Sequence, residues 1–150
     1  MSVSKDFEEL FACLSAHGVR ALVVGAYAVA FHGKPRFTKD IDILVEPTLE
    51  NAARLVAALA DFGFGSVGLS ADDFVVPGRV VQLGYPPNRV DLITAIDGVD
   101  FDSAWRGRVA GPYGSAEVFY LGKDELIRNK LASGRPQDQV DLAALQDECS

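Results

Sequence analysis

Asp40-Ile41-Asp42-Ile43-Leu44-Val45 is the stretch that decides how this chain folds. Alternate residues of a β-strand point to the same face of a sheet, so Ile41, Ile43 and Val45 can pack into a core while Asp40 and Asp42 project together. Neighbouring like charges repel, and a positive group between them offsets that cost. A divalent cation is the obvious candidate, because magnesium takes one or two protein carboxylates together with phosphate oxygens. The pair therefore indicates phosphate chemistry.

Composition predicts one cytoplasmic domain spanning residues 1–150. A hydrophobic content of 49% and a charged content of 23% are those of an ordinary globular protein. No apolar run approaches the ~18 residues of a membrane helix, and the start lacks the layout of a secretion signal. The two cysteines, Cys13 and Cys149, do not make a disulfide framework. We therefore expect no membrane partner.

The net charge of −7 argues against a free-standing nucleic-acid binder, because such binding depends on neutralising phosphates with Lys and Arg. A small, locally basic pocket is still compatible with this balance. Lys34, Arg36 and Lys39 precede Asp40 directly, and the acidic excess lies elsewhere in the chain.

The hydrophobic pattern predicts a single mixed α/β domain without internal repeats. Residues 65–74 are expected to form a loop with at most one turn, and 79–83 and 89–93 an antiparallel hairpin. The expected strands are 20–24, 40–45, 79–83, 89–93 and 117–121, and the expected helices are 4–17, 27–31, 47–62, 100–106, 123–133 and 137–146.

Three features of the sequence combine into one geometry. The strand–Gly25-Ala26–helix junction places backbone N–H groups and a helix N-terminus where an anion can approach. Asp40 and Asp42 lie on the next strand, and Asp91 lies on a later strand that could pair beside it. Three carboxylates around two divalent ions are the arrangement used in two-metal phosphoryl chemistry.

With these residues the chain resembles the minimal nucleotidyltransferases of the DNA polymerase β superfamily. Their signature is a strand, Gly-Gly or Gly-Ser, a short spacer, Asp-apolar-Asp or Asp-apolar-Glu, and a later Asp on a strand. The corresponding residues here are Gly25-Ala26, Asp40-Ile41-Asp42 and Asp91. The stretch 25–45, which includes Arg36 and Thr38, is similar to the segment found in bacterial stand-alone members.

The C-terminal region extends the resemblance. Lys130, Arg135-Pro136-Gln137-Asp138 and Asp141-Leu142 are similar to an element of the nucleotidyltransferase toxins of type IV toxin–antitoxin systems. In those proteins the lysine is thought to hold the nucleotide triphosphate. One departure from the family pattern is Ala26, which keeps the backbone amide of the Gly-Gly or Gly-Ser pair but adds a methyl group and no donor.

The resemblance implies an α/β (α+β) fold: a short mixed sheet with flanking helices packed on one side and a C-terminal helical hairpin. It also implies transfer of a nucleoside monophosphate from an NTP to an acceptor hydroxyl of a tRNA, a protein or a small molecule. An antitoxin is the implied protein partner.

The resemblance also assigns roles to residues. Asp40, Asp42 and Asp91 would be the catalytic carboxylates that hold two Mg²⁺ or Mn²⁺ ions. Gly25, Ala26, Arg36, Lys39 and Lys130 would bind the nucleotide, supported by Thr38, Arg135, Asp138 and Asp141.

Other interpretations stay open at this point. The chain could be a catalytically silent nucleotidyltransferase-like module that works by binding a partner. Residues 130–141 could be the ordinary ion pairs of a two-helix hairpin, with Asp138 and Asp141 orienting Lys130 or Arg135. A Rossmann-type cofactor site is set aside, because the required Gly-x-Gly-x-x-Gly is missing after Gly25.

Overall fold

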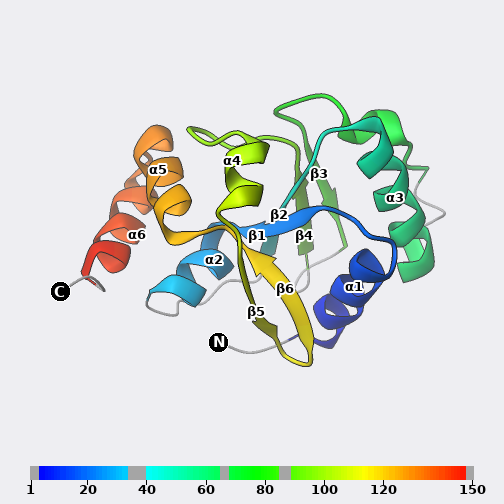
Figure 1. The fold of residues 1–150 in the computed structure, drawn as a ribbon, viewed down its shortest axis with the longest axis horizontal. Helices are drawn as coiled ribbons and strands as arrows, with labels where there is room; N and C mark the ends of the chain where they lie inside the picture. Colours follow the sequence, from blue (N-terminus) through cyan, green and yellow to red (C-terminus); the bar gives the residue numbers. More distant parts are fainter. Residues whose placement is uncertain (1–3, 34–39, 65–67, 85–88, 148–150) are drawn as a thin grey trace.

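The computed structural model describes residues 4–33, 40–64, 68–84 and 89–147. Within these residues the strands form one six-stranded mixed sheet in the order β3-β4-β2-β1-β6-β5 (Figure 1). The α+β fold expected from the sequence is confirmed. The strands are β1 (Ala21–Val24), β2 (Asp40–Val45), β3 (Val80–Leu83), β4 (Arg89–Ile93), β5 (Val109–Tyr113) and β6 (Ala116–Tyr120).

The helices follow the predicted positions closely. The Ser4 hydroxyl accepts a hydrogen bond from Phe7 N and so caps α1, and Thr48 caps α3 through Asn51 N. The 65–74 segment contains a short 3-10 helix in its described part. The helical elements are α1 (Lys5–Ala16), α2 (Gly25–His32), α3 (Leu49–Leu59), η1 (Ala60–Phe64), η3 (Ala71–Phe74), α4 (Phe101–Arg106), α5 (Lys123–Ser133) and α6 (Pro136–Asp147).

Strand β2 lies at the centre of the sheet and sets its register. It pairs antiparallel with β1, where Asp42 lies opposite Val24, and parallel with β4, where Asp42 lies opposite Asp91. Strands β3 and β4 form the expected antiparallel hairpin. The register brings the end of β1, the start of α2 and the two aspartates to the same place.

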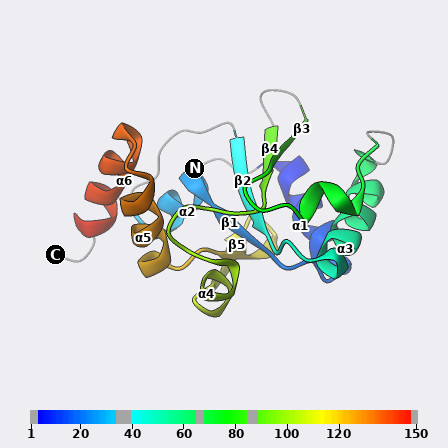
Figure 2. The same cartoon turned by 90° about the horizontal axis from the view of Figure 1, so that it is seen from above.

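Helices cover both faces of the sheet, so the expectation that they pack on one side is wrong. Val23 and Ile43 belong to a core with α1 and α3, whereas Leu22 and Leu44 belong to a second core with α4, α5 and α6. Figures 1 and 2 show α1 and α3 on one side of the strands and α5 and α6 on the other. The reason is that β1 and part of β2 are apolar at every position, which is typical of strands buried on both faces.

Strand β5 is absent from the predicted elements. It contains Gly111 and Pro112, which weaken a strand signal, and Pro112 is tolerated because β5 is the edge of the sheet. Gly111 also leaves room for Phe31, whose ring carbon Cε1 would lie 2.6 Å from a β-carbon at this position.

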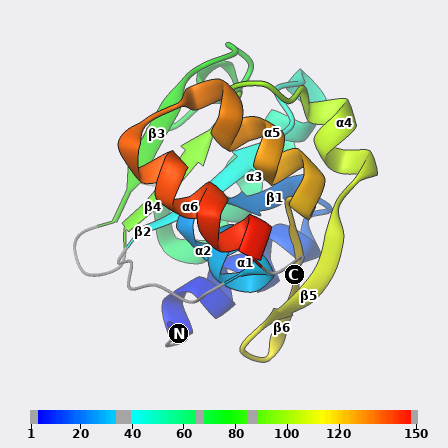
Figure 3. The same ribbon diagram turned by 90° about the vertical axis from the view of Figure 1, so that its left-hand side faces the viewer.

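The expected C-terminal helical hairpin is confirmed. Helix α5 ends at Gly134, which has a φ of 62° and donates its N–H to Lys130 O, and Pro136 starts α6. The two helices pack against each other and lie in front of the strands in Figure 3. Leu126 of α5 and Leu145 of α6 are fully buried in the second core. No helix in these described ranges has the length and apolar character needed to cross a membrane.

Candidate functional site

The turn between β1 and α2 forms one wall of the site. Gly25 has a φ of 67°, and a β-carbon there would overlap Asp42 Oδ2 and lie 3.1 Å from Asp42 Cγ. Helix α2 begins at Gly25, and no side chain among the described residues caps this end. The N–H groups of its first turn are therefore available to an anion. Ala26 is buried, so its extra methyl group is largely accommodated in the fold.

Asp42 and Asp91 face each other across the parallel strands β2 and β4. Burial, the charge of Asp91 and a hydrogen bond with Asp91 together raise the pKa of Asp42 to about 6, and the charge of Asp40 acts in the same direction. The ammonium of Lys130 opposes this rise. Within the described residues, negative charge is therefore concentrated on this face of the sheet, and Lys130 offsets its effect on Asp42 only in part.

Arg89 lies between the carboxylates of Asp40 and Asp91. Its Nη2 donates to Asp40 Oδ2 at 2.6 Å, and its Nε lies 3.6 Å from Asp91 Oδ1. Among the residues that the structure describes, no three His, Cys, Asp or Glu side chains converge closely enough to hold a metal. The three aspartates share one face of the sheet but do not form a closed ligand set.

The donor set still fits magnesium. Asp42 and Asp91 provide hard oxygen ligands beside a turn whose backbone N–H groups are open to an anion. Magnesium commonly uses one or two carboxylates and completes its shell with phosphate and water oxygens. Asp91 Oδ1 is buried and, within the described residues, has no hydrogen-bond partner. Asp42 and Asp91 would hold the ion together with Asp40, which lies on the same face of β2.

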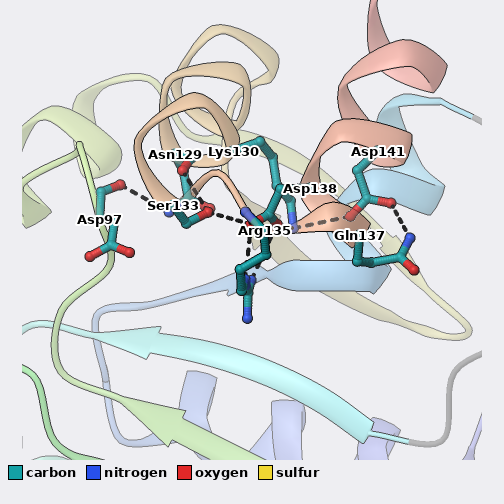
Figure 4. A network of polar contacts seen from close by, with 8 residues as sticks. All are labelled: Asp97, Asn129, Lys130, Ser133, Arg135, Gln137, Asp138 and Asp141. Atoms are coloured by element: carbon teal, nitrogen blue, oxygen red, sulfur yellow. Dashed lines mark hydrogen bonds and ion pairs between the residues drawn. The ribbon is translucent and has the colours of Figure 1, made fainter.

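Lys130 lies in a buried network formed by α5 and α6 (Figure 4). Its Nζ lies 3.1 Å from Asp138 Oδ1 and 3.2 Å from Asp141 Oδ2, and the three side chains are almost fully buried. Ser133 Oγ donates to Asp138 Oδ2 at 2.6 Å, and Arg135 Nε donates to the same oxygen at 2.9 Å. This is more than the exposed ion pairs of an ordinary helical hairpin.

Asp138 is held in its charged form by its neighbours in this network. Burial alone would raise the pKa of Asp138, but hydrogen bonds from Arg135, Ser133 and Lys130 lower it well below its ordinary value. Asp141 accepts a further hydrogen bond from Gln137 Nε2 at 3.1 Å. Two carboxylates thus fix the Lys130 ammonium, whose charge still reaches Asp42.

These elements surround one cleft of about 660 Å³, a volume within the range of small-molecule sites. The carboxylates line one wall, the β1–α2 turn a second, and Lys130 and Arg135 a third. The lining residues named as site residues in the sequence are Gly25, Ala26, Asp40, Asp42, Asp91, Lys130 and Arg135. Residues far apart in the chain are brought together as the pattern predicted.

Not every residue singled out in the sequence is placed. Arg36, Thr38 and Lys39 lie outside the described residues. Arg89 was missed, although its position two residues before Asp91 on the same strand puts both side chains on one face. This alternation along the strand could have indicated from the sequence that Arg89 lies beside Asp91 at the site.

Comparison with known proteins identifies the fold. No family model matches the chain, and no curated protein matches it. A candidate nucleotidyltransferase from Thermotoga maritima has a solved structure with 18% identity, a TM-score of 0.61, and coverage of 95% of this chain and 91% of that one. The chain has the nucleotidyltransferase fold.

Two further structures share this nucleotidyltransferase fold. An antigenic nucleotidyltransferase-like protein from Paracoccidioides brasiliensis is 17% identical, with a TM-score of 0.57 over 97% of this chain and 77% of that one. The lincosamide antibiotic adenylyltransferase LnuA, with lincomycin bound, is 14% identical, with a TM-score of 0.59 over 99% of both chains.

The turn at Gly25 gives a prediction about this nucleotidyltransferase fold. Gly25→Ala is expected to destabilise the protein by about 2–4 kcal/mol, because it adds left-handed backbone strain and overlap with Asp42. Gly18→Ala is the matched control, since Gly18 has the same φ of 67° and no atom within 4 Å of the added carbon. Urea unfolding should show a smaller loss for Gly18→Ala, and equal losses would contradict the close approach.

The raised pKa of Asp42 predicts a pH dependence of stability. The Asp42 carboxyl loses its proton at lower pH in the unfolded chain than in the folded chain. Protonated Asp42 therefore stabilises the folded state fully below the unfolded pKa, and this stabilisation is lost as pH rises through about 6. The loss between pH 4 and 7 amounts to about 2 kcal/mol without metal. Urea unfolding of wild type and Asp42→Asn with EDTA measures it. A difference between them that stays constant with pH would contradict the prediction.

Proposed function

We propose that this protein is a metal-dependent nucleotidyltransferase, which moves a nucleoside monophosphate from an NTP to an acceptor hydroxyl. The observation that carries the proposal is the pairing of Asp42 with Asp91 directly beside the Gly25 turn. A cation-binding carboxylate pair and an anion-binding helix start then share one cleft. Nucleotide–metal complexes require both.

The chemistry would be an in-line transfer at the α-phosphorus. The acceptor oxygen forms a bond to this phosphorus, the bond to the bridging oxygen breaks, and pyrophosphate leaves. Magnesium or manganese, when bound, would lower the pKa of the acceptor hydroxyl and neutralise charge on the pyrophosphate. Asp40, Asp42 and Asp91 would hold the ions, and Asp91 would also help to remove the acceptor proton.

The opposite wall would bind the triphosphate. Lys130 has three N–H donors. One donates to Asp138, Asp141 lies 3.2 Å from the same nitrogen, and a further donor would bind a phosphate oxygen. The Arg135 side chain is 71% exposed at the same wall and supplies a second cation. The first-turn amides of α2 complete the set, while Arg36, Thr38 and Lys39 stay expectations from the sequence.

A small molecule is the acceptor class that we favour. LnuA is an antibiotic adenylyltransferase and matches this chain over 99% of both lengths, so a chain of this size has room for such an acceptor. A tRNA or a protein acceptor, as in a type IV toxin–antitoxin pair with its antitoxin, is the second candidate and rests on the C-terminal sequence resemblance.

Binding and labelling together test the proposal. Wild-type protein should bind an NTP at millimolar levels or better in calorimetry, and only in the presence of Mg²⁺ or Mn²⁺. Incubation with each α-labelled NTP and cell extract should then label one acceptor. Absence of nucleotide and metal binding would overturn the enzymatic proposal. Binding without any labelled product would favour the catalytically silent module.

A further inference from the structure

We propose that Arg89 is a counter-cation of Asp40 and Asp91 when no divalent ion is bound, and that its guanidinium competes with that ion for these two carboxylates. Arg89 is then a positioning residue that sets the affinity for the metal. This inference rests on the proposed function, because it concerns the same metal site.

The register of the sheet places Arg89 there. In the parallel ladder of β2 and β4, Asp40 lies opposite Arg89, and Asp42 lies opposite Asp91. A like-charge pair directly across a ladder is unfavourable, and an opposite-charge pair is favourable. The Asp40–Arg89 pair compensates the Asp42–Asp91 pair, because all four side chains lie at alternate positions on one face of the sheet.

The guanidinium contacts both neighbouring carboxylates but satisfies only one. Nη2 donates to Asp40 Oδ2 at 2.6 Å, whereas the 3.6 Å between Nε and Asp91 Oδ1 is too long for a hydrogen bond. Both of these atoms are buried, and neither has a hydrogen-bond partner within the described chain. A buried polar atom without a partner is costly, so Asp91 Oδ1 is ready to exchange this contact for a metal ion.

Competition follows from position and charge. The guanidinium lies between Asp40 and Asp91, so it occupies space that a bridging ion would need. The guanidinium of Arg89 carries one positive charge, and an ion with two charges would attract the same carboxylate oxygens more strongly. The exchange is feasible because the Arg89 side chain is 34% exposed.

The experiment compares Mn²⁺ affinity in wild type, Arg89→Gln and Arg54→Gln, using metal-stripped protein and electron paramagnetic resonance. Arg54 is the matched control: it loses the same charge and the same kind of contact, an ion pair to Glu50 of 2.6 Å, on the outer helix α3. We expect Arg89→Gln to bind Mn²⁺ about tenfold more tightly than wild type, a change of about 1.4 kcal/mol. Arg54→Gln should stay within about twofold of wild type.

A second measurement covers the case in which Arg89→Gln is poorly folded without metal. The melting temperature should then rise more with saturating Mn²⁺ in Arg89→Gln than in wild type. An unchanged or weaker Mn²⁺ affinity in folded Arg89→Gln, or an equal gain in Arg54→Gln, would overturn the role of Arg89 alone. If wild type and Arg89→Gln both bind no Mn²⁺ even with an NTP present, the proposed function fails with it.

Discussion

Asp42→Asn is expected to slow nucleotidyl transfer by about a hundredfold to a thousandfold, the loss typical when one preorganised electrostatic group is removed. Asp42 contacts the Gly25 turn and pairs with Asp91, so it lies where the phosphate and the cation would meet. Asparagine keeps the shape and removes the charge. Transfer of label from an α-labelled NTP to the acceptor, at saturating Mn²⁺, measures the effect.

The folded state gives an independent check on this substitution. Asp42→Asn removes a charge whose pKa the fold raises, so the metal-free variant should be at least as stable as wild type at neutral pH. Loss of activity would then not be a loss of folding. Asp72→Asn, at an exposed aspartate in η3, should keep full activity. Normal transfer by Asp42→Asn would contradict the assignment of this carboxylate.

Lys130→Ala is expected to destabilise the protein by about 3–5 kcal/mol, because it leaves the buried carboxylates Asp138 and Asp141 without their cation. Loss of one partner from a buried ion pair costs far more than loss of a surface pair. The midpoint of urea unfolding should fall accordingly. We expect this to be the largest stability effect of any charged side chain at the cleft.

Arg128→Ala on the same helix is the control for Lys130→Ala. Arg128 is half exposed, and its nitrogen lies 3.9 Å from Glu125 Oε1, so its removal should change the unfolding free energy by less than about 1 kcal/mol. Equal effects of the two substitutions would show that the Lys130 network is not a buried one in solution. Lys130→Ala at low temperature, where it is folded, should also bind NTP more weakly than wild type.

The sequence alone was enough to predict the carboxylate face. Alternation along β2 places Asp40 and Asp42 together, and an apolar strand around Asp91 is a natural neighbour for it. The pairing of Asp42 with Asp91 confirms that neighbourhood. The two-residue periodicity of a strand indicates which side chains share a face, so the carboxylate face could be predicted without knowing which strands pair.

Other features depend on tertiary structure and could not be predicted in the same way. Arg89 faces Asp40 because of a strand register that nothing in the local sequence specifies. The burial of Lys130 depends on how α6 folds back over α5, whereas the polar sequence of α5 is equally compatible with exposure. Strand β5 forms because it pairs antiparallel with β6, although Gly111 and Pro112 do not favour a strand.

The parallel register of β2 and β4 also ties ligand binding to folding. Asp42 and Asp91 belong to strands separated in the chain by α3, η1, η3 and β3, and Lys130 lies still further along the chain in α5. No fragment of the sequence carries the site, so binding competence should arise only when the whole sheet and the α5–α6 pair have assembled. A nucleotide–metal complex would bind the complete domain alone, and it would therefore shift the unfolding equilibrium of the entire domain as one cooperative unit.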